Sequence, residues 1–205
     1  MRGDVILVGE EHRRAAVLIA DRLVDAVTST DRRFTLTVAG ESGSGKSETA
    51  QALAEALDGH AIRAAILQQD DYYVLPPRSN DAARRANFCW VGTTEVRLDL
   101  LDAHLKAAQT GAESIVKPLV IFDEDRIDEE TVSLEGTDVV IAEGVYTSLC
   151  DHVDRRVFLD RNRLEPLEHR LKRGREDFDP FLEQILTREH AIISEHRARA
   201  DIVIT

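Results

Sequence analysis

A glycine-rich stretch, GESGSGKS at residues 40–47, constrains the fold of this chain more than any other feature. It matches the spacing G-x-x-x-x-G-K-[ST], and it lies between a β-rich run at 33–40 and a strongly helical run at 47–60. In that strand–loop–helix context, backbone N–H groups and the helix N-terminus together form an anion site. The stretch therefore predicts a phosphate-binding loop in an α/β protein, rather than a glycine-rich turn that matches by chance.

The residue types of this loop suit a nucleoside triphosphate. Glycines let N–H groups converge on phosphate oxygens, the lysine can reach the β- and γ-phosphates, and the serine hydroxyl can bind Mg²⁺. The expected nucleotide-binding residues of the loop are Gly40, Glu41, Ser42, Gly43, Ser44, Gly45, Lys46, Ser47 and Glu48.

Runs typical of strands alternate with runs typical of helices along the rest of the chain. Expected strands are 4–10, 33–40, 61–69, 137–144, 155–160 and 201–205, and expected helices are 10–27, 47–60, 93–111, 163–176 and 180–198. The helix at 93–111 has a threonine cap, residues 74–92 look like a long loop with a helical turn, and 117–134 suggests a small β-hairpin. This alternation predicts a three-layer α/β fold around a mainly parallel sheet of five strands.

Composition favours one soluble, cytoplasmic domain spanning residues 1–205, because no repeat or low-complexity linker divides the chain. The net charge of −12 argues against a general nucleic-acid or membrane-surface binder, since both need clustered Lys and Arg. No apolar run is long enough to span a bilayer, and the charged N-terminus is unlike a signal peptide. A homo-oligomer is compatible with this composition.

Acidic residues follow two of the expected strands. Asp70 and Asp71 come after the strand at 61–69, and Glu143 ends the apolar run VVIAE. In open α/β sheets, ligands bind beyond the carboxyl ends of the strands, where a carboxylate can hold Mg²⁺ or accept a proton from an attacking hydroxyl. We therefore expect Ser47, Asp70 and Glu143 to form a metal site, with a solvated acidic loop as the alternative for the aspartate pair.

A basic segment, HRLKRGRED at 169–177, precedes the last expected helix. Arg170, Arg173 and Arg175 could close over a triphosphate as a lid and stabilise charge in the transition state. The alternative is a solvated cationic face of a helix. The chain has no D-x-x-G after the metal strand and no N-K-x-D later, which argues against a guanine switch protein.

Five features in this order resemble the uridine kinase and phosphoribulokinase family of small-molecule kinases: GESGSGKS, QDDYY, VVIAEG, RLKRGR and FLEQIL…ADIVIT. The resemblance runs from about Phe34 to the end of the chain. It implies a nucleoside monophosphate kinase-like fold, the cofactors ATP and Mg²⁺, and transfer of a phosphoryl group to a hydroxyl of a small molecule. It also implies that Asp70 is the general base and that Tyr73 lines the acceptor site. Lys46 and Arg173 would then neutralise the charge that develops on the transferred group.

The chain departs from this family on the acceptor side. NFCWVG (87–92) has Cys89 and Trp90 where uridine–cytidine kinases have Asp and His, and VIFDED (120–125) has Val120 and Asp125 where they have Tyr and His. Donor-side motifs are therefore retained while the residues that read a pyrimidine are not. Trp90 can either stack on a ring in the acceptor pocket or anchor its loop. The expected acceptor-site residues are Asp70, Tyr72, Tyr73, Trp90 and Glu143.

These features favour an ATP-dependent kinase acting on an alcohol of a small metabolite, with a nucleoside among the candidates. A non-catalytic ATP-binding regulatory module and a toxin-like nucleotide-sugar kinase are the alternatives. In this interpretation residues 1–32 add a strand and helix to the family core, about 74–92 and 117–134 face the acceptor, and about 163–178 form the lid.

Overall fold

The computed structural model describes residues 1–3, 5–160 and 180–205 of the chain. Its centre is a sheet with the strand order β2-β5-β1-β6-β7. The strands are β1 (Phe34–Gly40), β2 (Ala64–Gln68), β5 (Val139–Glu143), β6 (Arg155–Leu159) and β7 (Ile202–Ile204). Every neighbouring pair is parallel, so the carboxyl ends of all five strands point to one edge of the sheet. The expected parallel five-stranded sheet is confirmed.

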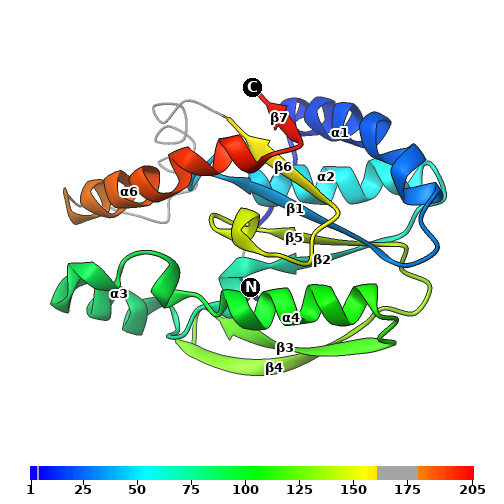
Figure 1. Ribbon diagram of the computed structural model, residues 1–205. Coiled ribbons are helices and arrows are strands. Elements are labelled where there is room, and N and C mark those ends of the chain that lie inside the picture. Colours follow the sequence, from blue (N-terminus) through cyan, green and yellow to red (C-terminus); the bar gives the residue numbers. More distant parts are fainter. Residues whose placement is uncertain (4, 161–179) are drawn as a thin grey trace.

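Helices cover both faces of this sheet and produce three layers (Figure 1). Strand β5 is buried at every position, because alternate side chains of a strand point to opposite faces and both faces are covered. Val139 and Ile141 pack in one core with helices α1 (Glu10–Thr28) and α2 (Lys46–Asp58). Val140 and Ala142 pack on the other face with helix α4 (Leu98–Gln109).

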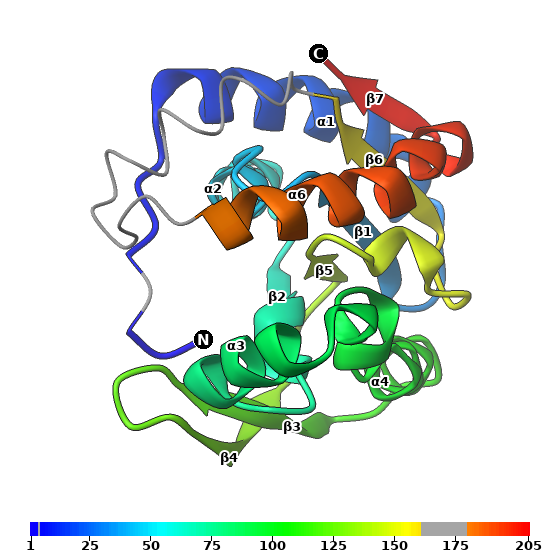
Figure 2. The ribbon, with the colours of Figure 1, turned by 90° about the vertical axis from the view of Figure 1, so that its left-hand side faces the viewer.

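Further elements gather at the carboxyl edge of the sheet, which faces the viewer in Figure 2. They are helix α3 (Pro77–Ala86) and helix α6 (Pro180–Ile193). The antiparallel hairpin of β3 (Ser114–Ile121) and β4 (Arg126–Ser133) runs below α4 in Figure 1, and its turn reaches the first residues of α3. Short 3₁₀ turns connect the elements: η1 (Gln69–Tyr72), η2 (Phe88–Trp90), η3 (Thr93–Glu95), η4 (Thr147–Leu149) and η5 (Ser194–Arg199). The expected hairpin is confirmed, although it begins three residues earlier than the sequence suggests. Within the described ranges, no helix is both long and apolar enough to cross a membrane.

The prediction of a strand at residues 4–10 is wrong. Residues 5–9 have no regular structure, and helix α1 begins at Glu10. Val5 and Leu7 are 61% and 65% exposed, so this apolar run gains little burial. A strand needs a paired neighbour to satisfy its backbone, and Arg2 forms only an isolated bridge with Ile121.

The region between β2 and α4 is more helical than the sequence suggests. Residues 77–86 form a helix of ten residues instead of a loop with one helical turn, and Pro77 occupies a position at its start that favours proline. Residues 93–95 form a separate 3₁₀ turn, so α4 starts at Leu98 without the threonine cap that was expected. Near the end of the chain, the α-helix expected at 180–198 ends at Ile193, and the 3₁₀ turn η5 follows it.

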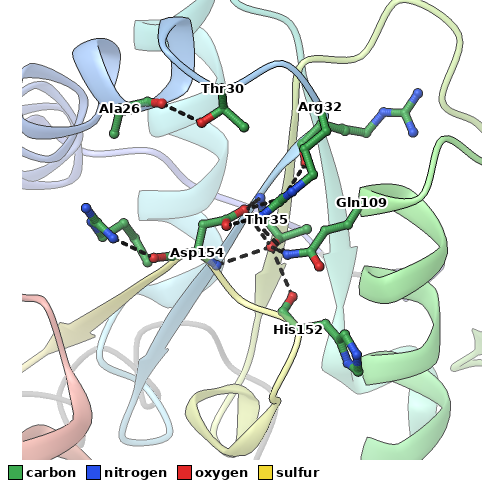
Figure 3. A network of polar contacts seen from close by, with 9 residues as sticks. Ala26, Thr30, Arg32, Thr35, Gln109, His152 and Asp154 are labelled. Atoms are coloured by element: carbon green, nitrogen blue, oxygen red, sulfur yellow. Dashed lines mark hydrogen bonds and ion pairs between the residues drawn. The ribbon is translucent and has the colours of Figure 1, made fainter.

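A polar network joins the elements at the opposite, amino-terminal edge of the sheet (Figure 3). Asp154 accepts hydrogen bonds from the Thr35 backbone at 2.8 Å and from Arg32 at 2.6 and 2.9 Å. Thr35 Oγ1 donates to the His152 carbonyl at 3.0 Å and accepts from Gln109 Nε2 at 2.7 Å. The network ties the starts of β1 and β6 to the end of α4.

Candidate active site

A cavity of about 320 Å³ lies at the carboxyl edge of the sheet. Its walls come from the phosphate loop, the end of β5, turn η1, helices α3 and α6, and the hairpin. Segments far apart in the sequence meet there because every parallel strand ends at this edge. The cavity therefore lies where the sequence expected a ligand.

The phosphate loop contributes Ser42, Gly43, Lys46 and Ser47 to the cavity wall. Gly45 has a φ of 83°, in the left-handed region that favours glycine, and it is the N-cap of α2. Gly40 has a φ of 156°, and a Cβ there would lie 2.8 Å from the Leu159 carbonyl oxygen. These backbone positions account for two of the three glycines in the motif.

The charged residues expected at the phosphate loop, Glu41, Lys46 and Glu48, have different surroundings. Lys46 Nζ donates a hydrogen bond to the Glu41 carbonyl at 2.8 Å, and the Glu41 carboxylate lies 2.5 Å from His190 Nδ1 of α6. Glu48 is 3% exposed in the first turn of α2 and is not part of the cavity wall. Of the acidic residues expected at the nucleotide, neither Glu41 nor Glu48 lines the cavity itself.

Ser47 and Glu143 meet at the base of the cavity. Ser47 Oγ donates to Glu143 Oε1 at 3.0 Å, and Glu143 is 3% exposed. Burial and the negative charge of Asp70 raise the pKa of Glu143 to about 7, against the opposing effects of Lys46 and Ser47. A cation at this point would favour the ionised carboxylate, so the residues fit the expected Mg²⁺.

No group of three or more His, Cys, Asp or Glu side chains in the described part of the chain is arranged to hold a metal ion. A divalent ion held by Ser47 and the nearby carboxylates would therefore need other oxygen ligands. Mg²⁺ commonly takes them from substrate phosphates and water. The donor set suits a metal that binds together with a nucleotide.

The two neighbouring aspartates of turn η1 have different surroundings. Asp70 lines the same cavity as Lys46, as the sequence predicted. Asp71 is 1% exposed, and its carboxylate accepts a hydrogen bond from Lys117 Nζ at 2.6 Å. Of the two aspartates, only Asp70 therefore lines this cavity.

The two neighbouring tyrosines also differ. Tyr73 lines the cavity, whereas Tyr72 is 0% exposed and its hydroxyl lies 2.9 Å from His104 Nδ1. The expectation that Tyr72 faces the acceptor does not match this position. Trp90 is not part of the cavity wall either, since its Nε1 donates to Asn80 Oδ1 at 2.8 Å. This contact agrees with the alternative in which Trp90 anchors its loop.

Three polar residues of the cavity wall were not anticipated: Asn80, Arg84 and Glu189. Arg84 donates to both oxygens of the fully buried Glu95 at 2.6 and 2.9 Å, and Asn80 Nδ2 donates to the same carboxylate at 2.8 Å. Asn80 and Arg84 are four residues apart, so they share one face of α3. That spacing would have indicated a common face only if the helix itself had been predicted.

The hairpin supplies an apolar wall and fixes α3. Val120 and Phe122 line the cavity. Asp125, in the turn between β3 and β4, accepts from the Arg78 backbone at 2.7 Å and from Ser79 Oγ at 2.9 Å. Of the two residues that replace the family's pyrimidine readers, Val120 therefore faces the cavity and Asp125 binds the first turn of α3.

The expected lid, about residues 163–178, lies outside the described residues, and so do Arg170, Arg173 and Arg175. Helix α6 follows it directly and contributes Leu182, Ile185 and Leu186 to the cavity wall. The proposed roles of the three arginines therefore stay predictions from the sequence.

Proteins with related sequences include known kinases. A uridine kinase of Bacillus pumilus (strain SAFR-032) is 30% identical to this chain over 184 residues, which cover 82% of this chain and 83% of that protein. Among solved structures, a D-glycerate 3-kinase from Cryptococcus neoformans has a TM-score of 0.63 at 15% identity and covers 92% of this chain and 90% of its own. A protein from Bacillus stearothermophilus, described as a possible uridine kinase, has a TM-score of 0.62 at 21% identity and covers 94% and 98%.

At these identities the two structures show a common fold, that of P-loop kinases. The family evidence comes from the sequence. A model of the phosphoribulokinase / uridine kinase family matches residues 35–204, which include the phosphate loop, turn η1, β5 and α6. The chain belongs to the phosphoribulokinase / uridine kinase family.

Proposed function

We propose that this protein uses ATP and Mg²⁺ to transfer the γ-phosphoryl group to a hydroxyl of a small metabolite. The observation that supports this most strongly is that Lys46 and Asp70 line one cavity, with Ser47 and Glu143 hydrogen-bonded at its base. A nucleotide-binding module without catalysis has no need of a carboxylate opposite the phosphate lysine.

Each of these side chains has a proposed role. Asp70 accepts the proton of the attacking hydroxyl, and Lys46 neutralises charge on the transferred group. Ser47 and Glu143 hold Mg²⁺, directly or through water, with Asp70 close to the same ion. Arg173, supported by Arg170 and Arg175, closes over the phosphates. In such a reaction the protein supplies mainly position and electrostatic stabilisation.

The acceptor is a hydroxyl compound of metabolite size. Related proteins are named for uridine and for D-glycerate, and both carry hydroxyl groups. The wall around Asp70 combines the apolar Val120 and Phe122 with the polar Asn80 and Tyr73. A nucleoside therefore remains among the candidates, although Val120 and Asp125 replace the residues that read a pyrimidine.

A screen of ATP consumption by the purified protein tests this proposal. The acceptor panel contains nucleosides, sugar phosphates, glycerate, pantothenate and nucleotide sugars. We expect at least one acceptor to stimulate ADP release, and Lys46→Ala to abolish that stimulation. Lys106→Ala, a change at an exposed lysine of α4, is the matched control and should behave as wild type.

The same screen separates the alternatives. Stimulation by nucleotide sugars alone would support the nucleotide-sugar kinase. Slow ATP hydrolysis that no acceptor accelerates would contradict the proposed kinase and favour a regulatory module in which ATP orders part of the chain.

A further inference from the structure

Asp71 and Lys117 form an ion pair inside the protein, next to the cavity. Their side chains are 2% and 5% exposed, and Lys117 Nζ lies 2.6 Å from Asp71 Oδ2. Removing two charges from water is costly, and their mutual attraction compensates only when the geometry is good and the remaining polar atoms are bonded. Such a pair is weak evidence for a role in stability alone.

Both partners form further contacts with the hairpin. Lys117 Nζ also lies 3.1 Å from Glu130 Oε2 of β4 and donates to the Pro118 carbonyl at 3.2 Å. Asp71 Oδ1 accepts from the Val120 backbone N–H at 3.0 Å, and the amino group of Met1 lies 3.1 Å from the same oxygen. The pair thus joins turn η1 to both strands of the hairpin.

The junction between turn η1 and the hairpin adjoins residues that line the cavity. Asp70 precedes Asp71 in turn η1, and Val120, whose N–H binds Asp71, contributes its side chain to the cavity wall. A shift of the hairpin relative to the turn would therefore change the distance between Asp70 and the apolar wall. Displacements of about 1 Å are enough to lower reaction rates by roughly a hundredfold.

We propose that Asp71 and Lys117 are positioning residues for the acceptor end of the site. Their ion pair fixes the turn that carries Asp70 against the hairpin wall, so that the base and the bound acceptor keep one geometry. This inference rests on the proposed function. It assigns a role to Asp71, the second of the two neighbouring aspartates, that neither the phosphate-loop motif nor the position of the base provides.

Kinetic measurements on Asp71→Asn, Lys117→Met and the double variant test the positioning role. Each single change breaks the Asp71–Lys117 pair and leaves the remaining charge with its other charged contact, Glu130 for Lys117 or the Met1 amino group for Asp71. The double change removes both charges of the pair. With the acceptor found in the screen, we expect kcat/KM for the acceptor to fall by roughly tenfold to a hundredfold in each single variant. The KM for ATP should stay unchanged, and the double variant should recover part of the loss.

Hydrogen exchange of the peptide containing Val120 provides a readout that does not depend on activity. Faster exchange in both single variants, with partial protection restored in the double variant, would support the proposal that the Asp71–Lys117 pair holds turn η1 against the hairpin. Arg126→Gln is the matched control, because it breaks exposed ion pairs with Glu124 and Asp128 on the same hairpin. It should change neither acceptor kinetics nor exchange at Val120.

Two results would overturn the inference: single variants with wild-type acceptor kinetics, or single variants in which Val120 exchanges as in wild type. A lower melting temperature with unchanged kinetics of the folded enzyme would reduce the pair to a structural role. Failure of the proposed function looks different, since the wild type itself would then show no acceptor-dependent turnover while the exchange measurement still tests the junction.

Discussion

Asp70 is the exposed residue of turn η1, whose other three residues, Gln69, Asp71 and Tyr72, are buried. Its side chain contributes little to the packed core, because the apolar residues of η1 and its neighbours point inward. Replacing it should therefore separate chemistry from folding more cleanly than a change at Glu143, which is 3% exposed.

Asp70→Asn should lower acceptor-dependent turnover by roughly 10²–10⁴-fold, the usual contribution of a general base. The isosteric amide keeps the shape of the side chain but cannot take up the proton. Steady-state kinetics would measure turnover, and a thermal melt with ATP would measure stability. The melting temperature should match that of wild type. Asp99→Asn, at an exposed position of α4, is the control. Turnover at the wild-type level in Asp70→Asn would remove the base assignment.

The neighbouring tyrosines provide a second comparison at single positions. Tyr72→Phe should cost about 1 kcal/mol of unfolding free energy, the net contribution of one hydrogen bond, because its hydroxyl contacts His104. Acceptor kinetics should not change. Tyr73→Phe is the matched variant on the cavity wall and should alter the KM for the acceptor. A larger kinetic effect of Tyr72→Phe than of Tyr73→Phe would contradict the placement of these side chains.

Sequence patterns located the positions of the site better than the directions of its side chains. Lys46, Ser47, Asp70 and Glu143 follow directly from a motif or from the end of an apolar strand, and they meet in the structure. Which residue of a neighbouring pair faces the cavity depends on tertiary packing of the 3₁₀ turn, which has no two-residue or 3.6-residue period to read. The prediction for Tyr72 therefore did not match the structure.

At the scale of elements, the buried strands were predictable because continuous apolar runs such as VVIAE indicate a strand covered on both faces. Helix α3 was not, since PRSNDAARRA has no large apolar side chain and buries only Asn80. Its conformation depends on partners elsewhere: Asp125 binds its first turn, and Glu95 binds Asn80 and Arg84. An element held by distant polar contacts leaves no periodic signal in its own sequence.

The dependence of α3 on Glu95 can be measured. Glu95→Gln leaves Arg84 beside a neutral side chain, and losing one partner of a buried pair costs about 3 kcal/mol or more. Urea unfolding should show a loss of that order, with Asn80 and Arg84 no longer held at the cavity wall. Arg85→Gln is the control on the same helix, since its exposed pair with Asp81 should contribute less than about 1 kcal/mol. Equal losses in the two variants would contradict this account.

On the scale of the whole molecule, the two edges of the sheet serve different purposes. The carboxyl edge holds the cavity, with its charged side chains and glycine-rich backbone. The amino edge holds the network of Thr35, Gln109 and Asp154, which joins β1, α4 and the start of β6 (Figure 3). The core of the sheet separates them, so a change in the network should affect stability without affecting turnover.

Because of Asp154, the stability that this network contributes depends on pH. Burial alone would raise its pKa, but hydrogen bonds from Arg32 and Thr35 outweigh that effect, so the pKa of Asp154 lies below its usual value. A carboxyl group with a lowered folded pKa stabilises the protein above its unfolded pKa of about 3.9, and this contribution disappears as the pH falls through the folded pKa. Asp154→Asn should therefore lower the free energy of unfolding by about 2 kcal/mol at neutral pH. Urea titrations across the acid range should show the two curves converging below about pH 4. Asp31→Asn, at an exposed position, serves as the control. Two results would contradict the separation of the two edges: a stability difference between Asp154→Asn and wild type that stays constant down to low pH, or a loss of acceptor turnover at neutral pH.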